Sequence, residues 1–305
     1  MSLKIIHTKN LKWIDIVNPG EEDIGYLKNH FRFHPLDFDD VKTPSTRTKI
    51  DEYDQYHFLI LLFPRLEKNT NELKPAEVDF FVGDGFVITI HDGKIKTLAN
   101  LVHNVSQYDN LRLQYTSDNS GFLLFSILEL LFKRSFPILD TINREMEAAG
   151  KEIFESNGKI LQELSRLKKN IIVYRRVMKM HKYVLTKLMR SKNEYLDFKL
   201  ARNSFQNLIE YVENIWDVLA SDKETAESYE ETNQSLAAHR MNDVLKTLTI
   251  FSVIIFLLTL IVNILVFADY SFKFASVPFA FPASLILLGI VTLIMLAFFK
   301  NRRWL

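Results

Sequence analysis

Two apolar runs near the C-terminal end dominate the hydrophobic pattern of the sequence. The 22 residues 247–268 and the 26 residues 274–299 contain no Asp, Glu, Lys or Arg. A membrane-spanning helix needs roughly 20 apolar residues at a rise of ~1.5 Å each. The pattern therefore predicts two transmembrane helices, at 247–268 and 278–299, joined by a short loop at 269–277. Two buried core helices of a soluble protein are the alternative.

The first part of the chain alternates short apolar runs with turn residues. Residues 1–135 predict strands at 56–66 and 78–91, the second folded as a hairpin around a Gly-Asp-Gly turn. Residues 19–33 predict a helix with acidic residues in its first turn. Strands and helices mixed in this way indicate an α+β domain with an α/β/α layered arrangement.

Long helical segments follow this domain. Residues 136–193 predict a helical hairpin, and residues 194–246 predict a stalk helix that runs without Pro or Gly into the first span. One helix is therefore expected from about 194 to 268. Its apolar residues repeat in steps of three and four, which predicts a coiled-coil-like seam: Phe205, Leu208, Val212, Ile215 and Leu219. Identical copies around an axis would give such a helix partners along its length.

One face of this helix carries polar side chains into the membrane. Its residues are spaced alternately by three and four: Asn242, Leu245, Thr249, Ser252, Phe256, Thr259 and Asn263. We call them the polar stripe. One interpretation is a pore lined by hydroxyls and amides, with Leu245 and Phe256 as apolar constrictions that gate by dewetting. The other is that small polar residues pack helix against helix.

Composition narrows the function further. The 305 residues carry a formal net charge of +1, which gives no reason to expect a nucleic-acid partner. There is no cysteine, so disulfides, thiol nucleophiles and thiolate metal sites are excluded. No Walker loop, dinucleotide-binding fingerprint or nucleophile elbow occurs, and we do not expect an enzyme.

Charge at the two ends predicts the topology. The N-terminal residues lack the apolar segment of a signal peptide. The tail 300–305 places Lys300, Arg302 and Arg303 directly after the second span. The positive-inside rule puts this tail in the cytoplasm, and two spans then put the N-terminus there too. We expect a multi-pass protein of the cell (inner) membrane, in contact with the lipid bilayer, with an extracellular loop at 269–277.

The histidines give weak candidates for a metal site. His30 and His34 are four residues apart, a spacing that can hold a metal on a helix. Pro35 follows directly, which favours an ordinary surface pair instead. His91 and His103 have no ligand-like companions in the sequence.

Six stretches of the chain form a recognisable series. They are, in order, WIDIVNPGEEDIGYLKNHFRFHPLDFDDV, KIDEYDQYHFLILLF, FFVGDGFVITIH, LQELSRLKKNIIVYRRVM, RMNDVLKTLTI and KNRRWL. Together they resemble the CorA family of pentameric divalent-cation transporters. The resemblance implies a funnel-shaped homopentamer in which the stalk helix continues as the pore-lining span and the second span forms an outer ring. Asn242, Leu245 and Thr259 match positions that line the family's pore.

The outer mouth departs from the family pattern. Members end the first span with Gly-Met-Asn, or with Gly-Ile-Asn in zinc-transporting relatives, and the Asn ring holds a hydrated cation. This sequence has Val266, Phe267 and Ala268 there. In the loop only Asp269 is acidic, and Lys273 lies close to it. The sequence is therefore identified as a divergent member, and the transported ion is left open between Mg²⁺ and Zn²⁺, Co²⁺ or Ni²⁺.

Asn263 lies five residues before the lost Asn position, about one and a half turns deeper. Five copies could form a substitute amide ring, or the amide could make an interhelical hydrogen bond. The resemblance also implies regulatory divalent cations on the stalk, for which we consider Glu210, Glu213 and Asp217. Two functions remain: a divalent-cation channel or transporter with an altered mouth, and a pentameric membrane scaffold or regulator that has lost permeation.

Overall fold

The computed structural model describes residues 2–8, 11–116, 119–153, 159–191, 193–196, 202–272 and 280–302. They form two compact units, Met1–Glu230 and Glu231–Leu305, and the long helix α9 (Arg202–Phe272) contributes residues to both. We describe each unit by itself.

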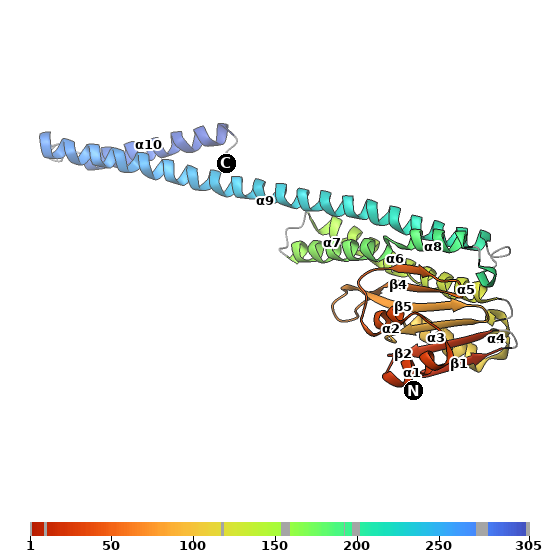
Figure 1. The fold of residues 1–305 in the computed structure, drawn as a ribbon. Helices are drawn as coiled ribbons and strands as arrows, with labels where there is room; N and C mark the ends of the chain where they lie inside the picture. The colour runs from red at the N-terminus through yellow and green to blue at the C-terminus, as the bar shows by residue number, and fades with distance from the viewer. Residues whose placement is uncertain are drawn as a thin grey trace. The chain divides into compact units, whose positions relative to one another are not determined.

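The N-terminal unit is built on a six-stranded sheet in the order β1-β2-β6-β5-β4-β3 (Figure 1). Strands β2 and β6 pair in parallel, and the other neighbours pair antiparallel. The bounds are β1 Leu3–His7, β2 Lys12–Val17, β3 Lys49–Glu52, β4 Tyr56–Leu66, β5 Leu73–Gly83 and β6 Phe86–His91. Both predicted strand regions are confirmed, and β5 and β6 form the predicted hairpin. Gly85 in its turn has a φ of 69°, which glycine adopts without steric cost.

Helices cover both faces of this sheet, which confirms the layered α+β arrangement. On one face, α1 (Glu21–His30) and α2 (Pro35–Lys42) pack on an aromatic cluster that includes Phe33, Phe58 and Phe81. The other face carries α5 (Ser120–Lys133), α6 (Phe136–Glu152) and α7 (Lys159–Met178). Because both faces are covered, the interior strand β4 is buried at nine consecutive positions, which explains its long apolar run.

The remaining helices of this unit are α3 (Lys96–Gln107), α4 (Asp109–Thr116) and α8 (His181–Arg190). The segment predicted as one hairpin at 136–193 therefore contains three helices, α6, α7 and α8. The stalk helix α9 starts at Arg202, and the predicted start at 194 falls on a separate 3-10 turn, Glu194–Leu196.

The apolar seam of α9 is present as predicted, but identical copies of the chain are not what covers it. Phe205, Leu208, Val212, Ile215 and Leu219 are all buried within a single chain. Ring contacts show what covers this part of α9: Phe205 lies 5.6 Å from Phe125 of α5, and Tyr211 lies 5.8 Å from Phe136 of α6. Arg175 of α7 stacks on Trp216 at 4.7 Å. The seam is therefore part of the core of the N-terminal unit and is not free to pair identical copies.

The C-terminal unit contains the rest of α9 and the apolar helix α10 (Ala280–Asn301). Each helix includes a stretch long and apolar enough to cross a membrane, and only 6% of each such window is buried. Exposure of this extent removes the alternative of two core helices. Helix α9 continues past the predicted end of the first span at 268, as far as Phe272. Residues 269–272 of the predicted loop are therefore helical, and its residues 273–277 lie outside the described part of the chain. Where the span ends within α9 stays a prediction.

Candidate ion pathway

The polar stripe lies on an uncovered face of α9. Every one of its residues is exposed in the single chain: Asn242, Leu245, Thr249, Ser252, Phe256, Thr259 and Asn263. The two apolar members, Leu245 and Phe256, are 49% and 68% exposed. The structure therefore brings the predicted pore residues onto one continuous surface that nothing in the described chain occupies.

A different face of α9 is partly covered. Its buried and half-buried positions also follow helical spacing: Ile250, Val253, Ile254, Leu257, Leu258, Ile261 and Leu265. Helix α10 has a matching row of less exposed residues: Ser284, Leu288, Val291, Thr292, Met295 and Phe299. These two rows indicate that α9 and α10 pack face to face in this unit. At ~100° of rotation per residue, the centre of the covered face lies about 150° from the polar stripe.

Hydroxyl geometry on the stripe leaves oxygen acceptors available. Thr249 Oγ1 donates to the Leu245 carbonyl oxygen, and Thr259 Oγ1 donates to the Ile255 carbonyl oxygen, both at 2.8 Å. A hydroxyl whose proton is used in this way still has oxygen lone pairs to offer. The stripe can thus present acceptors to water or to a hydrated cation.

The outer end of the span is apolar where its side chains are described. Val266 and Phe267 are 63% and 69% exposed. Ala268 and Asp269 lie within α9, and their side chains are outside the described part of the structure. Phe267 is four residues beyond Asn263, so the two lie on one face about a turn apart. Asn263 is therefore the last described residue on this face that offers an amide.

Among the described residues, the three stalk carboxylates do not come together as a group of metal ligands. Glu210 and Asp217 are exposed, and Glu213 forms an ion pair with Lys182 of α8 at 2.5 Å. Glu213 and Asp217 share a pocket with Lys179 and Lys182, whose charges oppose a cation there. Their regulatory role stays a prediction.

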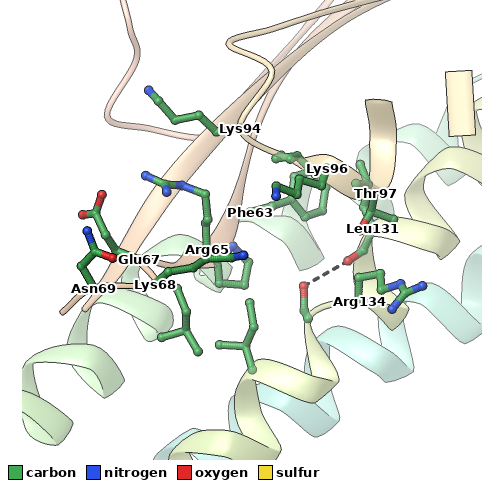
Figure 2. Close-up of a pocket in the computed structure, with 15 residues that line it drawn as sticks. Phe63, Arg65, Glu67, Lys68, Asn69, Lys94, Lys96, Thr97, Leu131 and Arg134 are labelled. Carbon is green, nitrogen blue, oxygen red and sulfur yellow. Dashed lines mark hydrogen bonds between the residues drawn. The ribbon is translucent and has the colours of Figure 1, made fainter. Parts of the chain in front are cut away.

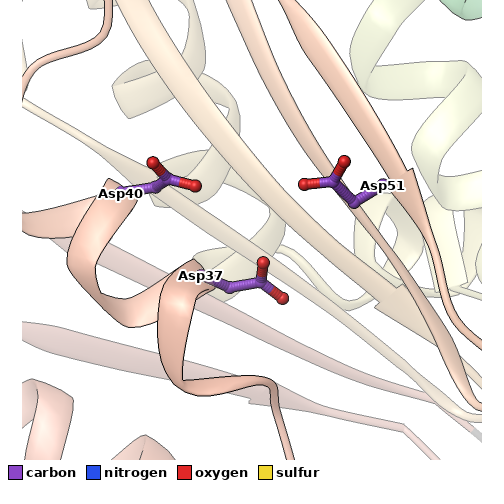
Figure 3. A group of neighbouring side chains, drawn as sticks. All are labelled: Asp37, Asp40 and Asp51. Carbon is purple, nitrogen blue, oxygen red and sulfur yellow. The ribbon is translucent and has the colours of Figure 1, made fainter.

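A different acidic group, not found from the sequence, does converge. The carboxylates of Asp37, Asp40 and Asp51 lie within 4.8 Å of one another, Asp37 and Asp40 on α2 and Asp51 on β3 (Figure 3). Lys49 donates to Asp40 at 2.5 Å and to Asp51 at 2.7 Å. Its ammonium therefore already supplies positive charge to this group.

The third carboxylate of the group is held by phenols. Tyr56 and Tyr53 donate to Asp37 at 2.7 and 3.0 Å. Burial raises the pKa of Asp37, and these hydrogen bonds oppose the rise. Burial also disfavours the charged form of Lys49, but its two carboxylate partners prevail and raise the pKa of Lys49. Each carboxylate of the group therefore already has a hydrogen-bond partner within the chain, and we assign no metal to it.

The histidines have structural roles. His34 is the N-cap of α2 and accepts from the Leu36 backbone N–H at 3.3 Å, while His30 Nδ1 lies 2.8 Å from the carbonyl oxygen of Tyr26. The two rings thus have separate partners, as expected for a surface pair.

His91 has a companion that sequence spacing did not indicate. Its Nε2 lies 3.2 Å from Asp15 on the neighbouring strand, and its Nδ1 accepts from the Gly93 N–H at 3.0 Å. Both ring nitrogens are engaged inside the buried sheet, which leaves neither for a metal.

Comparisons with known proteins agree with this architecture. The sequence pattern of the family described as "CorA-like Mg2+ transporter protein" matches residues 8–303. The "Cobalt/magnesium transport protein CorA" of Thermotoga maritima is 24% identical over 300 residues, which cover 96% of this chain and 83% of that protein.

Solved structures share the fold at low identity. The complete CorA magnesium transporter from Methanocaldococcus jannaschii superposes with a TM-score of 0.81 at 20% identity, covering 98% of this chain and 94% of that one. The full-length CmaX protein gives a TM-score of 0.73 at 16% identity, with 98% and 90% covered. Both likenesses extend from the sheet through the two apolar helices.

Proposed function

The chain belongs to the family of CorA-like Mg²⁺ transporter proteins, and we propose that it is a divalent-cation channel with an altered outer mouth. In this proposal five copies surround one axis in the cell membrane, and both termini are cytoplasmic. The polar stripe of each copy faces the axis. The α10 helices lie outside the ring of α9 helices, in contact with lipid.

The observation that carries this proposal is the position of the stripe relative to α10. Exposed amides and hydroxyls are costly against lipid, so a stripe that includes Asn263 needs protein or water in front of it. Helix α10 supplies neither, since the face it covers is about 150° away. A central aqueous path between copies would supply both. The basic tail after α10 supports its cytoplasmic placement.

The same geometry suggests how the pathway is controlled. Phe256 would place five aromatic rings at one level and Leu245 five aliphatic side chains at another, and narrow apolar necks resist hydrated ions. Between Phe256 and the mouth, Thr259 and Asn263 offer oxygen atoms. Mg²⁺ gives up its water reluctantly, so an amide ring at Asn263 would contact the hydration shell and not the bare ion. Zn²⁺, Co²⁺ and Ni²⁺ remain candidate substrates beside Mg²⁺.

The competing function is a pentameric scaffold or regulator without permeation. It is favoured by the missing Gly-Met-Asn sequence, because Val266 and Phe267 carry no oxygen ligands. Metal flux into liposomes that contain the purified protein separates the two functions. The channel should give saturable flux of at least one of the four ions. The scaffold should give no flux above that of empty liposomes.

Asn263→Leu then tests the role of the amide ring. Leu is close to Asn in volume but lacks the amide, so saturable flux should be lost while the oligomer remains. Val262→Leu is the matched control, because it adds a Leu at nearly the same depth about 100° away from the stripe. Unaltered flux in Asn263→Leu would remove this residue from the pathway. Equal loss in both variants would point to packing damage.

A further inference from the structure

A basic pocket of about 480 Å³ lies on the sheet face that also carries α5 and α6. Five cationic side chains line it (Figure 2): Arg65, Lys68, Lys94, Lys96 and Arg134. Arg65 comes from β4, Lys68 from the turn after it, Lys96 from the start of α3 and Arg134 from the end of α5. Segments far apart in the sequence therefore bring positive charge to one cavity of the N-terminal unit.

The protein balances only part of the positive charge in this pocket. Its one acidic lining residue, Glu67, pairs with Lys74, and Lys94 pairs with Asp92 at 2.6 Å. Among the residues that the structure describes, the other four cations have no ion pair: Arg65, Lys68, Lys96 and Arg134. Like charges collected without counterions raise the free energy of the folded protein, unless an anion binds between them.

One of these cations also has an unused donor. The Nε atom of Arg65 is buried, and within the described parts of the chain it has no hydrogen-bond partner. A buried donor without an acceptor is costly, and a charged one more so. An anion in the pocket would supply the missing acceptor.

The start of α3 adds to the positive potential. Its N-cap is Ile95, whose apolar side chain cannot accept a hydrogen bond. The first turn of α3 contains no acidic residue. The first N–H groups of a helix lack intrahelical partners, and Lys96 adds a cation at the positive end of the helix dipole. Stability alone would favour an acidic residue here. Oxyanions satisfy such a helix end well, and phosphates are frequent examples.

Apolar side chains also line part of this pocket, which narrows the chemical class of the ligand. Phe63, Leu66, Leu131 and Ile138 border the same cavity as the cations. A volume of about 480 Å³ is within the range of small-molecule sites, whereas a single phosphate would leave most of it empty. We infer that this pocket binds a nucleoside di- or triphosphate. Its phosphates would lie among Arg65, Lys68, Lys96 and Arg134, and its base or ribose would lie against the apolar side.

Calorimetric titration of the full-length protein in detergent tests this site. ATP, ADP, inorganic triphosphate and inorganic phosphate are the probes, used with EDTA at physiological salt so that metal binding does not contribute. ATP and ADP should bind saturably, and inorganic phosphate at least tenfold more weakly. Lys68→Gln and Lys96→Gln should each weaken ATP binding about tenfold. Both side chains are exposed, so neither change disturbs the core.

Lys151→Gln is the matched control, because it removes an exposed lysine from α6 at a residue that does not line the pocket. It should leave ATP binding unchanged. Absence of saturable binding of ATP and ADP would refute the proposed site. If Lys151→Gln weakened ATP binding as much as Lys68→Gln and Lys96→Gln do, the binding would be nonspecific attraction to positive charge. Inorganic triphosphate binding as tightly as ATP would overturn the nucleoside assignment. These outcomes do not depend on whether the protein conducts ions.

Discussion

His181 gives the N-terminal unit a specific sensitivity to acid. It is the first residue of α8 and is only 1% exposed. Phe63 of β4 and Phe132 of α5 meet its ring edge-on, at centroid distances of 5.5 and 5.3 Å. The imidazole thus lies in an apolar site between the sheet and the helices that cover it. A charged ring there would lose its hydration with little compensation.

The resulting pKa shift fixes the sign and size of the effect. Burial lowers the pKa of His181 from 6.5 to about 4, and the nearby backbone carbonyls offset only part of this. Above pH 7 the ring is neutral in both the folded and the unfolded state, so it contributes no pH dependence. As the pH falls below 6.5, His181 becomes protonated in the unfolded chain but stays neutral in the folded protein. The free energy of unfolding therefore decreases until the pH reaches about 4. At ~1.4 kcal/mol per pH unit, the loss at pH 5 is about 2 kcal/mol.

Denaturant unfolding of the detergent-solubilised protein at pH 7.5 and pH 5, followed by tryptophan fluorescence, measures this loss. Wild type should lose about 2 kcal/mol more than His181→Leu between the two pH values, because the variant has no group to protonate at this site. The comparison removes any packing cost of the substitution, which is present at both pH values. His103→Leu, on the exposed side of α3, should behave as wild type. Identical pH dependence in wild type and His181→Leu would refute the reasoning.

Two further predictions concern α9. Phe256→Ala should raise leak flux through the liposome-reconstituted protein while native mass spectrometry still finds five copies; unchanged leak would mean that Phe256 is not the neck. Leu208→Ala should lower the free energy of unfolding by about 2–5 kcal/mol, since it opens a cavity in a fully buried seam, without changing the number of copies. If Leu208→Ala instead dissociated into single copies at unchanged stability, the seam would have to be an interface between copies. A stable monomer or dimer of the wild-type protein would refute the five-membered ring.

Local pattern predicted those parts of the fold that depend on neighbouring residues. The apolar run at 56–66 and the Gly-Asp-Gly turn after 78–82 predicted β4 and the β5–β6 hairpin. A few neighbouring residues are enough to determine strand burial and turn geometry. The long charge-free runs predicted both apolar helices. Their ends were less well predicted: α9 continues four residues past 268, since nothing in Asp269 to Phe272 stops a helix.

Sequence pattern also showed that the seam is apolar without showing what covers it. A three-and-four repeat specifies one buried helix face, and helices of the same chain or of another copy satisfy it equally well. Only the three-dimensional arrangement shows that α5, α6 and α7 lie along this part of α9. The basic pocket was invisible for a related reason. Arg65 and Arg134 are 69 residues apart, and the packing of α5 on the sheet brings them to one pocket.

Burial of the seam moves the expected contact between copies to a later part of α9. From 239 to 249 every residue is exposed, and this stretch includes four large apolar side chains: Met241, Val244, Leu245 and Leu248. Their spacing of three and four gives one apolar face that borders the polar stripe and shares Leu245 with it, just before and at the start of the first span. A face of this kind is unstable in water unless a partner covers it. We therefore expect neighbouring copies to meet first here, which would place Leu245 near the axis and continue the pore from the stalk into the membrane.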